Sequence, residues 1–194
     1  MRAVPKVIRS VKKAMELLDL FTEERPEWGV TELAQALGLS KAALYHHFGS
    51  KEEILYEISL LALKGLVAAG EKALEVADPK EALRRFMEAH ARYFEENYPF
   101  FVTMLQGIKS LSPENRLKTI ALRDRHEENL RAILRRGVEQ GVFREVDVAL
   151  AGRAVLSMLN WMIRWFRPDG PMRAEEVARA YHDLILRGLE RGSA

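Results

Sequence analysis

The stretch from Val30 to Lys51, VTELAQALGLSKAALYHHFGSK, most restricts the possible folds because it encodes two short helices joined by one tight turn. Thr31 is a favourable N-cap, and the apolar residues that follow it up to Leu37 repeat at three- and four-residue spacing. This spacing predicts a short helix with one buried face.

The second half of the stretch predicts a turn and another helix. Gly38 tolerates the left-handed backbone that a sharp turn needs, and Ser40 is a favourable N-cap for a helix from Lys41 to about His47. The pattern is that of a helix-turn-helix. The face of the second helix that packing leaves free carries residues able to enter a DNA major groove: Lys41, Ala42, Ala43, Tyr45 and His46. A helical hairpin that serves only as core is the alternative.

Composition favours a helical protein with an uneven charge distribution. The chain has 194 residues, 48% of them hydrophobic and 30% charged, and its net charge is +2. Five basic residues and no acid lie in the first 13 positions. They form either a positive arm beside the helix-turn-helix or a solvated terminus. There are no cysteines, no apolar run long enough for a membrane span and no signal-peptide pattern, so we expect a cytoplasmic protein without disulfides.

Helical periodicity and capping signals continue to the C-terminus and predict an all-α fold of about nine helices. Asp78-Pro79 and Ser112-Pro113 are strong helix starts, with Glu81 completing a capping box at the first. The expected helices span about 7–24, 31–37, 41–47, 51–66, 79–97, 100–108, 113–140, 147–166 and 174–189. We expect a three-helix DNA-binding domain over residues 1–50 and a ligand-binding and dimerisation domain over 51–194, into which the fourth helix leads.

The body carries more aromatic and methionine residues than a tightly packed helical core requires. Methionines suit an adaptable apolar pocket, although ordinary core or a dimer interface explains each residue equally well. The candidate ligand-binding residues are Phe86, His90, Phe94, Phe101, Met104, Leu105, Leu122, His126, Met158, Met162 and Trp165.

The residues Leu37 to Lys41 and Leu44 to Glu53 resemble the turn, recognition helix and fourth-helix start of the tetracycline-repressor (TetR) family of transcriptional regulators. The resemblance spans the chain and implies a homodimer through the last two helices, about 147–166 and 174–189. It also implies two kinds of DNA contact. The residues that hold phosphates are Thr31, Tyr45, His47 and Lys51, and those that face base edges are Lys41, Ala42, Ala43 and His46. Ser40, at the start of the second helix, is also expected to contact DNA. His46 replaces the second aromatic residue of the family's usual Tyr-Tyr pair.

The stretch from Met158 to Pro171 is similar to TetR-family members that sense acyl-CoA thioesters. This similarity makes a long-chain acyl-CoA the first candidate for a small hydrophobic effector. Cations for its head group are available at Arg116, Lys118, Arg123 and Arg125, which a solvated helix face explains as well.

Other chemistries find little support in the residue spacing. His90 and His126 have no third ligand at metal spacing on the same helical face, so no metal or cofactor is expected. No nucleophile-histidine-carboxylate arrangement or phosphate loop is present, which argues against an enzyme. The sequence therefore favours a ligand-responsive homodimeric repressor of a palindromic DNA operator. The alternatives are a TetR-type regulator of another hydrophobic or aromatic ligand, a ligand-independent architectural DNA binder, and a helical enzyme or carrier.

Overall fold

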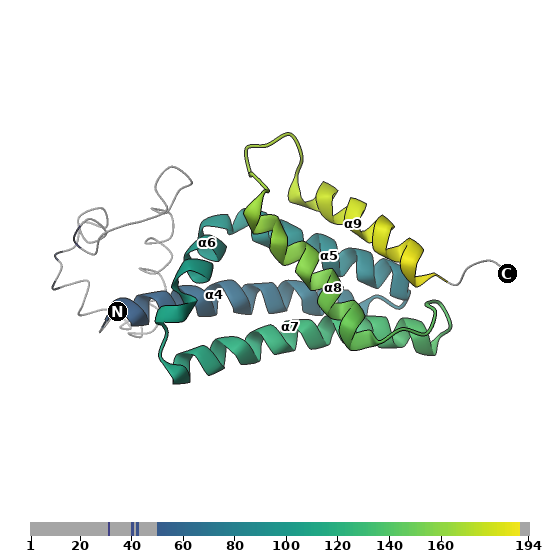
Figure 1. Cartoon of the computed structure of the whole chain (residues 1–194), viewed down its shortest axis with the longest axis horizontal. Coiled ribbons are helices and arrows are strands. Elements are labelled where there is room, and N and C mark those ends of the chain that lie inside the picture. The colour runs from purple at the N-terminus through teal and green to yellow at the C-terminus, as the bar shows by residue number, and fades with distance from the viewer. Residues whose placement is uncertain (1–30, 32–39, 41, 43–49, 191–194) are drawn as a thin grey trace, which may run out of the picture. The chain divides into compact units, whose positions relative to one another are not determined.

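The computed structural model describes residues 31, 40, 42 and 50–190, and within them the fold is all-α, as predicted (Figure 1). The α-helices are α4 (Lys51–Glu71), α5 (Pro79–Glu96), α6 (Tyr98–Gly107), α7 (Pro113–Glu139), α8 (Val148–Trp161) and α9 (Ala174–Leu189). Short 3-10 helices cover Lys72–Glu75, Ile108–Ser110 and Met162–Arg164. The six α-helices correspond to the six predicted after residue 50.

The three helices predicted before residue 50 lie outside the described residues except at single positions. Thr31 and Ala42 are helical and exposed, and Ser40 is exposed and not helical. The second helix of the motif therefore begins after Ser40, as its capping role predicts. Thr31 is helical rather than the N-cap residue before the helix, a difference within the usual uncertainty of helix ends.

Local capping signals explain where most of the described helices begin. The Ser50 hydroxyl accepts the Glu53 N–H at 3.1 Å, and the Asp147 carboxylate accepts the Leu150 N–H at 3.0 Å. The Asp78 carboxylate accepts the N–H groups of Lys80 and Glu81, as predicted. Glu81 does not follow the capping-box prediction, because its carboxylate binds Arg84 and Arg85.

Three predicted helix boundaries differ from the structure. Helix α4 continues to Glu71, five residues beyond its predicted end at about residue 66. Helix α6 begins at Tyr98 rather than Phe100 and includes Pro99, which a first helical turn accommodates because the missing N–H has no intrahelical acceptor there. Helix α8 ends at Trp161, and a 3-10 turn replaces its predicted continuation to Phe166. The segment 142–146 forms no strand, but Phe143 makes an isolated antiparallel bridge with Glu190.

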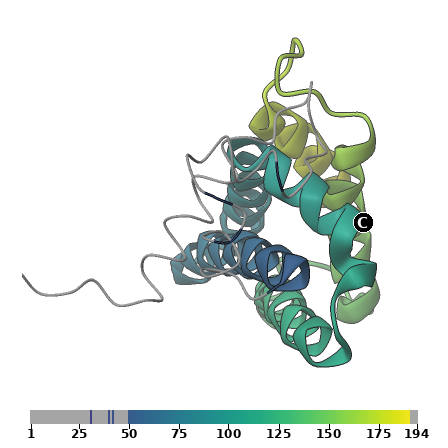
Figure 2. The ribbon, with the colours of Figure 1, turned by 90° about the vertical axis from the view of Figure 1, so that its left-hand side faces the viewer.

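The described residues fall into two compact units. One comprises residues 50–62 and 99–119, and the other comprises 63–98 and 120–190, so α4 and α7 contribute to both. In the second unit α5 contributes the side chains of Leu83, Phe86 and Met87 to the core, all fully buried. Figures 1 and 2 both show α9 running beside α5, so α9 packs along the helix that contributes Leu83, Phe86 and Met87 to the core.

Candidate functional site

Two buried histidines meet in the core of the second unit. His90 on α5 and His126 on α7 are 2% and 3% exposed, and His90 Nδ1 lies 3.0 Å from His126 Nε2. The Phe86 ring stacks on His126 with a centroid distance of 4.7 Å and an interplanar angle of 26°. Three of the eleven predicted ligand-binding residues therefore form one cluster, the histidine cluster, defined by Phe86, His90 and His126.

The histidine cluster is uncharged at neutral pH. Burial and the facing His126 ring hold the pKa of His90 well below its ordinary value. Burial lowers the pKa of His126 to about 4. Each ring therefore carries one proton, and one N–H connects the two rings, while His126 Nδ1 has no hydrogen-bond partner in the described part of the chain.

A glycine of α4 makes the closest approach to this cluster. A Cβ placed at Gly70 would lie 2.8 Å from Phe86 Cε2 and 3.1 Å from His126 Nδ1. Such distances leave no room for a side chain, so only glycine allows α4 to pack here. Gly70 was not among the predicted site residues, because nothing in the local sequence distinguishes it from other helical glycines.

The remaining predicted ligand residues are dispersed. Phe94 contacts Phe166 edge-on at a centroid distance of 5.9 Å, and Phe166 contacts Trp165 at 6.4 Å. Met162 is buried, whereas Leu122 and Met158 are half-buried. Phe101, Met104 and Leu105 belong to α6 in the first unit.

Two of these residues do not have the interior positions that the sequence predicted. Leu105 is 49% and Trp165 is 47% exposed. For Trp165 the reason is the early end of α8, because residues after Trp161 no longer follow the helical period on which the prediction rested. Two of the predicted cations have acidic partners: Lys118 binds Glu114 and Arg125 binds Glu71.

Four of the residues predicted to contact DNA are described, and one of them lies in the first turn of α4. Lys51 is exposed at the first position of the helix, where backbone N–H groups and a positive charge both suit a phosphate. Thr31, Ser40 and Ala42 are likewise exposed. The other predicted contacts, Lys41, Ala43, Tyr45, His46 and His47, lie outside the described residues.

Glu52 connects this turn to the start of α7 within the first unit. Its carboxylate accepts the Ser112 N–H at 2.7 Å and the Asn115 side-chain amide at 3.0 Å. The hydrogen bond from the Ser112 backbone, with those from the Ser112 and Asn115 side chains, lowers the pKa of Glu52. No local sequence pattern indicated this contact, because its partners are 60 and 63 residues away.

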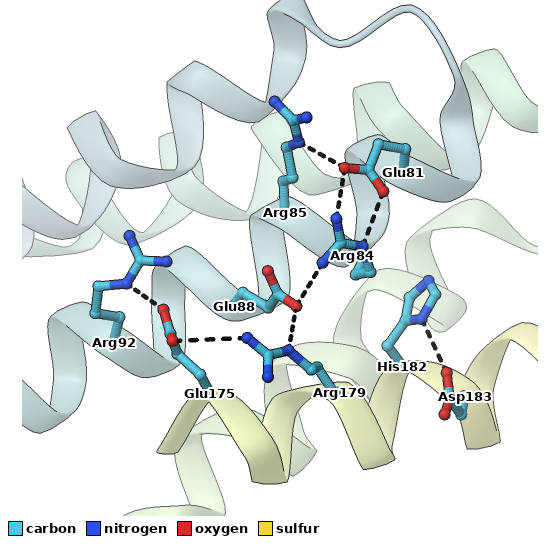
Figure 3. A network of polar contacts seen from close by, with 9 residues as sticks. All are labelled: Glu81, Arg84, Arg85, Glu88, Arg92, Glu175, Arg179, His182 and Asp183. Carbon is cyan, nitrogen blue, oxygen red and sulfur yellow. Dashed lines mark hydrogen bonds and ion pairs between the residues drawn. The ribbon is translucent and has the colours of Figure 1, made fainter. Parts of the chain in front are cut away.

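An ion-pair network fixes α9 against α5 (Figure 3). Glu88 on α5 is 7% exposed and binds Arg84 at 2.7 Å and Arg179 of α9 at 2.8 Å. Arg92 of α5 pairs with Glu175 of α9 at the next turn. The network attaches α9 to the helix that carries Phe86 and His90. Its intrahelical pairs at spacings of three and four could have been found in the sequence, but its pairs between helices could not.

Helices α8 and α9 expose large apolar side chains. Leu150 and Trp161 of α8 are 65% and 63% exposed, and Leu184 of α9 is 65% exposed. Ala154 and Ala180 are exposed on the same two helices. We call Leu150, Ala154, Trp161, Ala180 and Leu184 the apolar α8–α9 surface.

Two kinds of site receive no support from the described residues. In residues 50–190 no group of three or more His, Asp or Glu side chains is placed to hold a metal ion. None of the helices described there combines the length and apolar character that a membrane span requires.

Comparisons with known proteins identify both parts of the chain. A family model for the IclR helix-turn-helix domain matches residues 10–49, and one described as the tetracyclin repressor-like C-terminal domain matches residues 76–189. A helix-turn-helix before a helical body of this kind defines a DNA-binding transcriptional regulator. The chain belongs to the TetR family of transcriptional regulators.

Individual relatives agree with this assignment. The chain is 30% identical over 182 residues to the HTH-type transcriptional repressor KstR2 of Mycobacterium tuberculosis, covering 90% of this chain and 91% of the relative. The crystal structure of the TetR-family regulator PfmR from Thermus thermophilus matches at 92% identity and a TM-score of 0.87, over 93% of this chain and 100% of that one. The structure of AibR with isovaleryl coenzyme A and operator DNA shares the fold, at 24% identity, a TM-score of 0.79 and coverage of 91% and 97%.

The chain is therefore a DNA-binding transcriptional repressor of the TetR type. The family is one of regulators rather than enzymes.

Proposed function

We propose that the chain is a homodimeric repressor that binds a palindromic operator and is released from it by a small apolar effector, with a long-chain acyl-CoA as the first candidate. The observation that carries this proposal is the histidine cluster. A neutral polar pair with an unpaired nitrogen in an otherwise apolar core is expected of a site that recognises one polar group of a mostly apolar ligand.

The proposed DNA contacts divide into positioning and reading. Thr31, Tyr45, His47 and Lys51 bind phosphates and fix the register of the head on DNA. The second helix of the motif presents Lys41 and His46 as hydrogen-bonding groups to base edges, and Ala42 and Ala43 contact thymine methyl groups. The exposure of Thr31, Ser40, Ala42 and Lys51 leaves these residues accessible to DNA, which supports their role as contacts.

Two copies of the chain associate through α8 and α9. The exposed side chains of Leu150, Trp161 and Leu184 are costly in water and become buried when a second copy covers them. Ala154 and Ala180 are exposed on the same two helices, and their small side chains allow two helix pairs to approach closely. A two-fold dimer matches a palindromic operator whose half-sites are about one helical turn apart.

The acyl-CoA candidate draws support from relatives. AibR was crystallised with isovaleryl coenzyme A together with operator DNA, and the M. tuberculosis KstR2 structure, 26% identical to this chain, is described as that of a ketosteroid transcriptional regulator. Isovaleryl coenzyme A and a ketosteroid each combine an apolar body with a carbonyl group. Arg116 and Arg123 are exposed cations on α7 available to a CoA phosphate.

Release follows from a shift between two conformations of the dimer. An effector that binds more tightly to the conformation in which the heads do not match the half-sites lowers operator affinity by that difference in binding energy. Changing the bound fraction from 99% to 1% requires about a 10⁴-fold preference.

The test is binding of the purified full chain to the operator selected from random DNA, by fluorescence anisotropy, with and without palmitoyl-CoA. Release by palmitoyl-CoA but not by CoA alone supports the proposal. Unchanged affinity removes the acyl-CoA and leaves a regulator of another hydrophobic ligand. Equal affinity for all DNA sequences removes the operator and leaves the architectural DNA binder.

A further inference from the structure

His126 offers a buried hydrogen-bonding atom for which the described chain supplies no partner. Its Nε2 faces His90, but its Nδ1 is inaccessible to water and unpaired. Buried polar atoms in folded proteins nearly always find a partner, so an orphaned ring nitrogen calls for an explanation. Nδ1 lies beside the last turn of α4, 3.1 Å from where a Cβ at Gly70 would be.

The two rings can present either a donor or an acceptor at this atom. When His90 Nδ1 donates to His126 Nε2, the neutral His126 ring carries its proton on Nδ1 and offers a donor. When His126 Nε2 donates to His90, Nδ1 is a bare acceptor. The pair therefore matches a carbonyl through the first arrangement and a hydroxyl through either.

We propose that a neutral group of the effector, a thioester or ketone carbonyl or a hydroxyl, hydrogen-bonds to His126 Nδ1 and reaches it by separating His126 from Gly70. The inference rests on the proposed ligand response and specifies the chemistry of that site. A free carboxylate is a poor match, because burying its charge is costly and Phe86, His90 and His126 supply no fixed cation to offset that cost. A cation is a poor match because Phe86, His90 and His126 carry no negative charge.

Separating His126 from Gly70 moves α4, the helix that begins at the proposed DNA contact Lys51. With a Cβ at Gly70 excluded by Phe86 and His126, no group fits between α4 and the histidine cluster while they remain in contact. An effector atom on Nδ1 therefore moves the last turn of α4 away from α5 and α7. Helix α4 begins at Lys51, the proposed phosphate contact, so ligand and DNA act on opposite ends of one helix.

The carbonyl requirement is tested with two ligands that differ only in that group. Palmitoyl-CoA is a thioester, and S-hexadecyl-CoA is the corresponding thioether without the carbonyl. We expect the thioether to need at least a tenfold higher concentration to release the full chain from its operator. The substitution His126→Phe should raise the concentration of thioester required by a similar factor and leave the thioether unaffected.

A matched control is His182→Phe on α9. His182 is also buried and its ring nitrogens also lack hydrogen-bond partners, but it lies on α9, where its Nδ1 is 3.5 Å from Asp183 Oδ1 (Figure 3). This variant should keep the full preference for the thioester. Equal losses for thioester and thioether in His126→Phe, or an equal loss in His182→Phe, would overturn the inference while leaving acyl-CoA release intact.

The separation is tested without ligand by Gly70→Ala. The added methyl takes the place of the effector atom and should weaken operator binding severalfold in the absence of effector, with the helical content retained. Gly188→Ala is the control for helix propensity, because a Cβ there meets nothing within 4 Å. A folded Gly70→Ala protein with wild-type operator affinity would overturn the separation.

Nitrogen NMR of the histidine rings gives a readout that does not depend on DNA. The Nδ1 resonance of His126 in the full chain should shift when the thioester is added and stay in place with the thioether. Release by the thioester without such a shift would also overturn the inference. No effect of either ligand on the wild-type chain would overturn the acyl-CoA effector and its thioester contact, and Gly70→Ala would still decide whether His126 and Gly70 form the switch.

Discussion

Glu52 in the first turn of α4 accepts a 2.7 Å hydrogen bond from the backbone N–H of Ser112, the residue before α7. A carboxylate at this position satisfies an N–H group at the helix start and interacts favourably with the helix dipole. The contact fixes the helix turn that carries Lys51 to the beginning of α7 within the same unit.

We expect Glu52→Gln to reduce stability at pH 7 and to reduce its dependence on pH in acid. The pKa of Glu52 is lowered from 4.5, so the folded chain binds fewer protons than the unfolded chain. Its stabilisation is complete above pH 4.5 and is lost as the pH falls through the lowered pKa. Urea unfolding between pH 3 and pH 7 measures this, with the exposed Glu145→Gln as control. A variant whose pH profile matched the wild type would contradict it.

The histidine cluster should destabilise the protein at mildly acidic pH. Because the pKa of His126 is about 4 in the folded chain and 6.5 ordinarily, the unfolded chain binds the extra proton between these values. Stability is therefore full above pH 6.5 and falls by on the order of 3 kcal/mol as the pH drops to 4. The double variant His90→Phe/His126→Phe should flatten this part of the curve in urea unfolding. An unchanged slope would show that other groups cause it.

Two glycine-to-alanine substitutions should have opposite effects on stability. A Cβ at Gly137 would lie 2.1 Å from Phe143 Cδ2, so Gly137→Ala should cost about 1–3 kcal/mol through overpacking. A Cβ at Gly188 meets nothing within 4 Å, so Gly188→Ala should stabilise α9 by about 0.5–1 kcal/mol. Thermal melting of both variants checks the signs. Adding Phe143→Leu should recover part of the loss in Gly137→Ala.

Leu184→Glu should convert the proposed dimer to a folded monomer. The substitution places a charge on the apolar α8–α9 surface, where a second copy would bury it without a partner. Light scattering after gel filtration measures the mass, and circular dichroism the helical content. Leu117→Glu on α7 is the matched control because Leu117 is 66% exposed. A dimeric Leu184→Glu protein would place the interface elsewhere.

Lys51→Ala and Lys41→Ala should weaken DNA binding in different ways. Removing a phosphate contact at Lys51 should lower affinity for all sequences alike. It should also reduce the slope of log affinity against log salt concentration by about one. Removing a base contact at Lys41 should cost about 1–3 kcal/mol on the operator and relax discrimination at one base position. Binding to single-base operator variants at several salt concentrations separates the two. Equal loss of affinity across the operator variants in Lys41→Ala would favour the architectural binder.

The all-α class, the six described helices and most of their boundaries could be predicted from the sequence. These depend on groups a few residues apart: Asp78 with the N–H groups of the next turn, Asp147 with Leu150, Gly141 with a positive φ of 69° after α7. The helix-turn-helix follows for the same reason. The predicted end of α8 was wrong because no proline or glycine directly follows Trp161 to indicate where the helix ends. The exposure of Trp165 could not be predicted for the same reason.

Which side chains meet depends on the tertiary structure. His90 and His126 are 36 residues apart in the chain, and no local pattern indicates that their rings are hydrogen-bonded to each other. Glu52 with Ser112, Glu88 with Arg179 and Gly70 with His126 depend on how whole helices pack, which no local pattern encodes. Short-range hydrogen bonds and periodicity specify helices, whereas the partners of a buried polar atom depend on helices far apart in sequence, and so the orphaned Nδ1 of His126 became visible only in the folded chain.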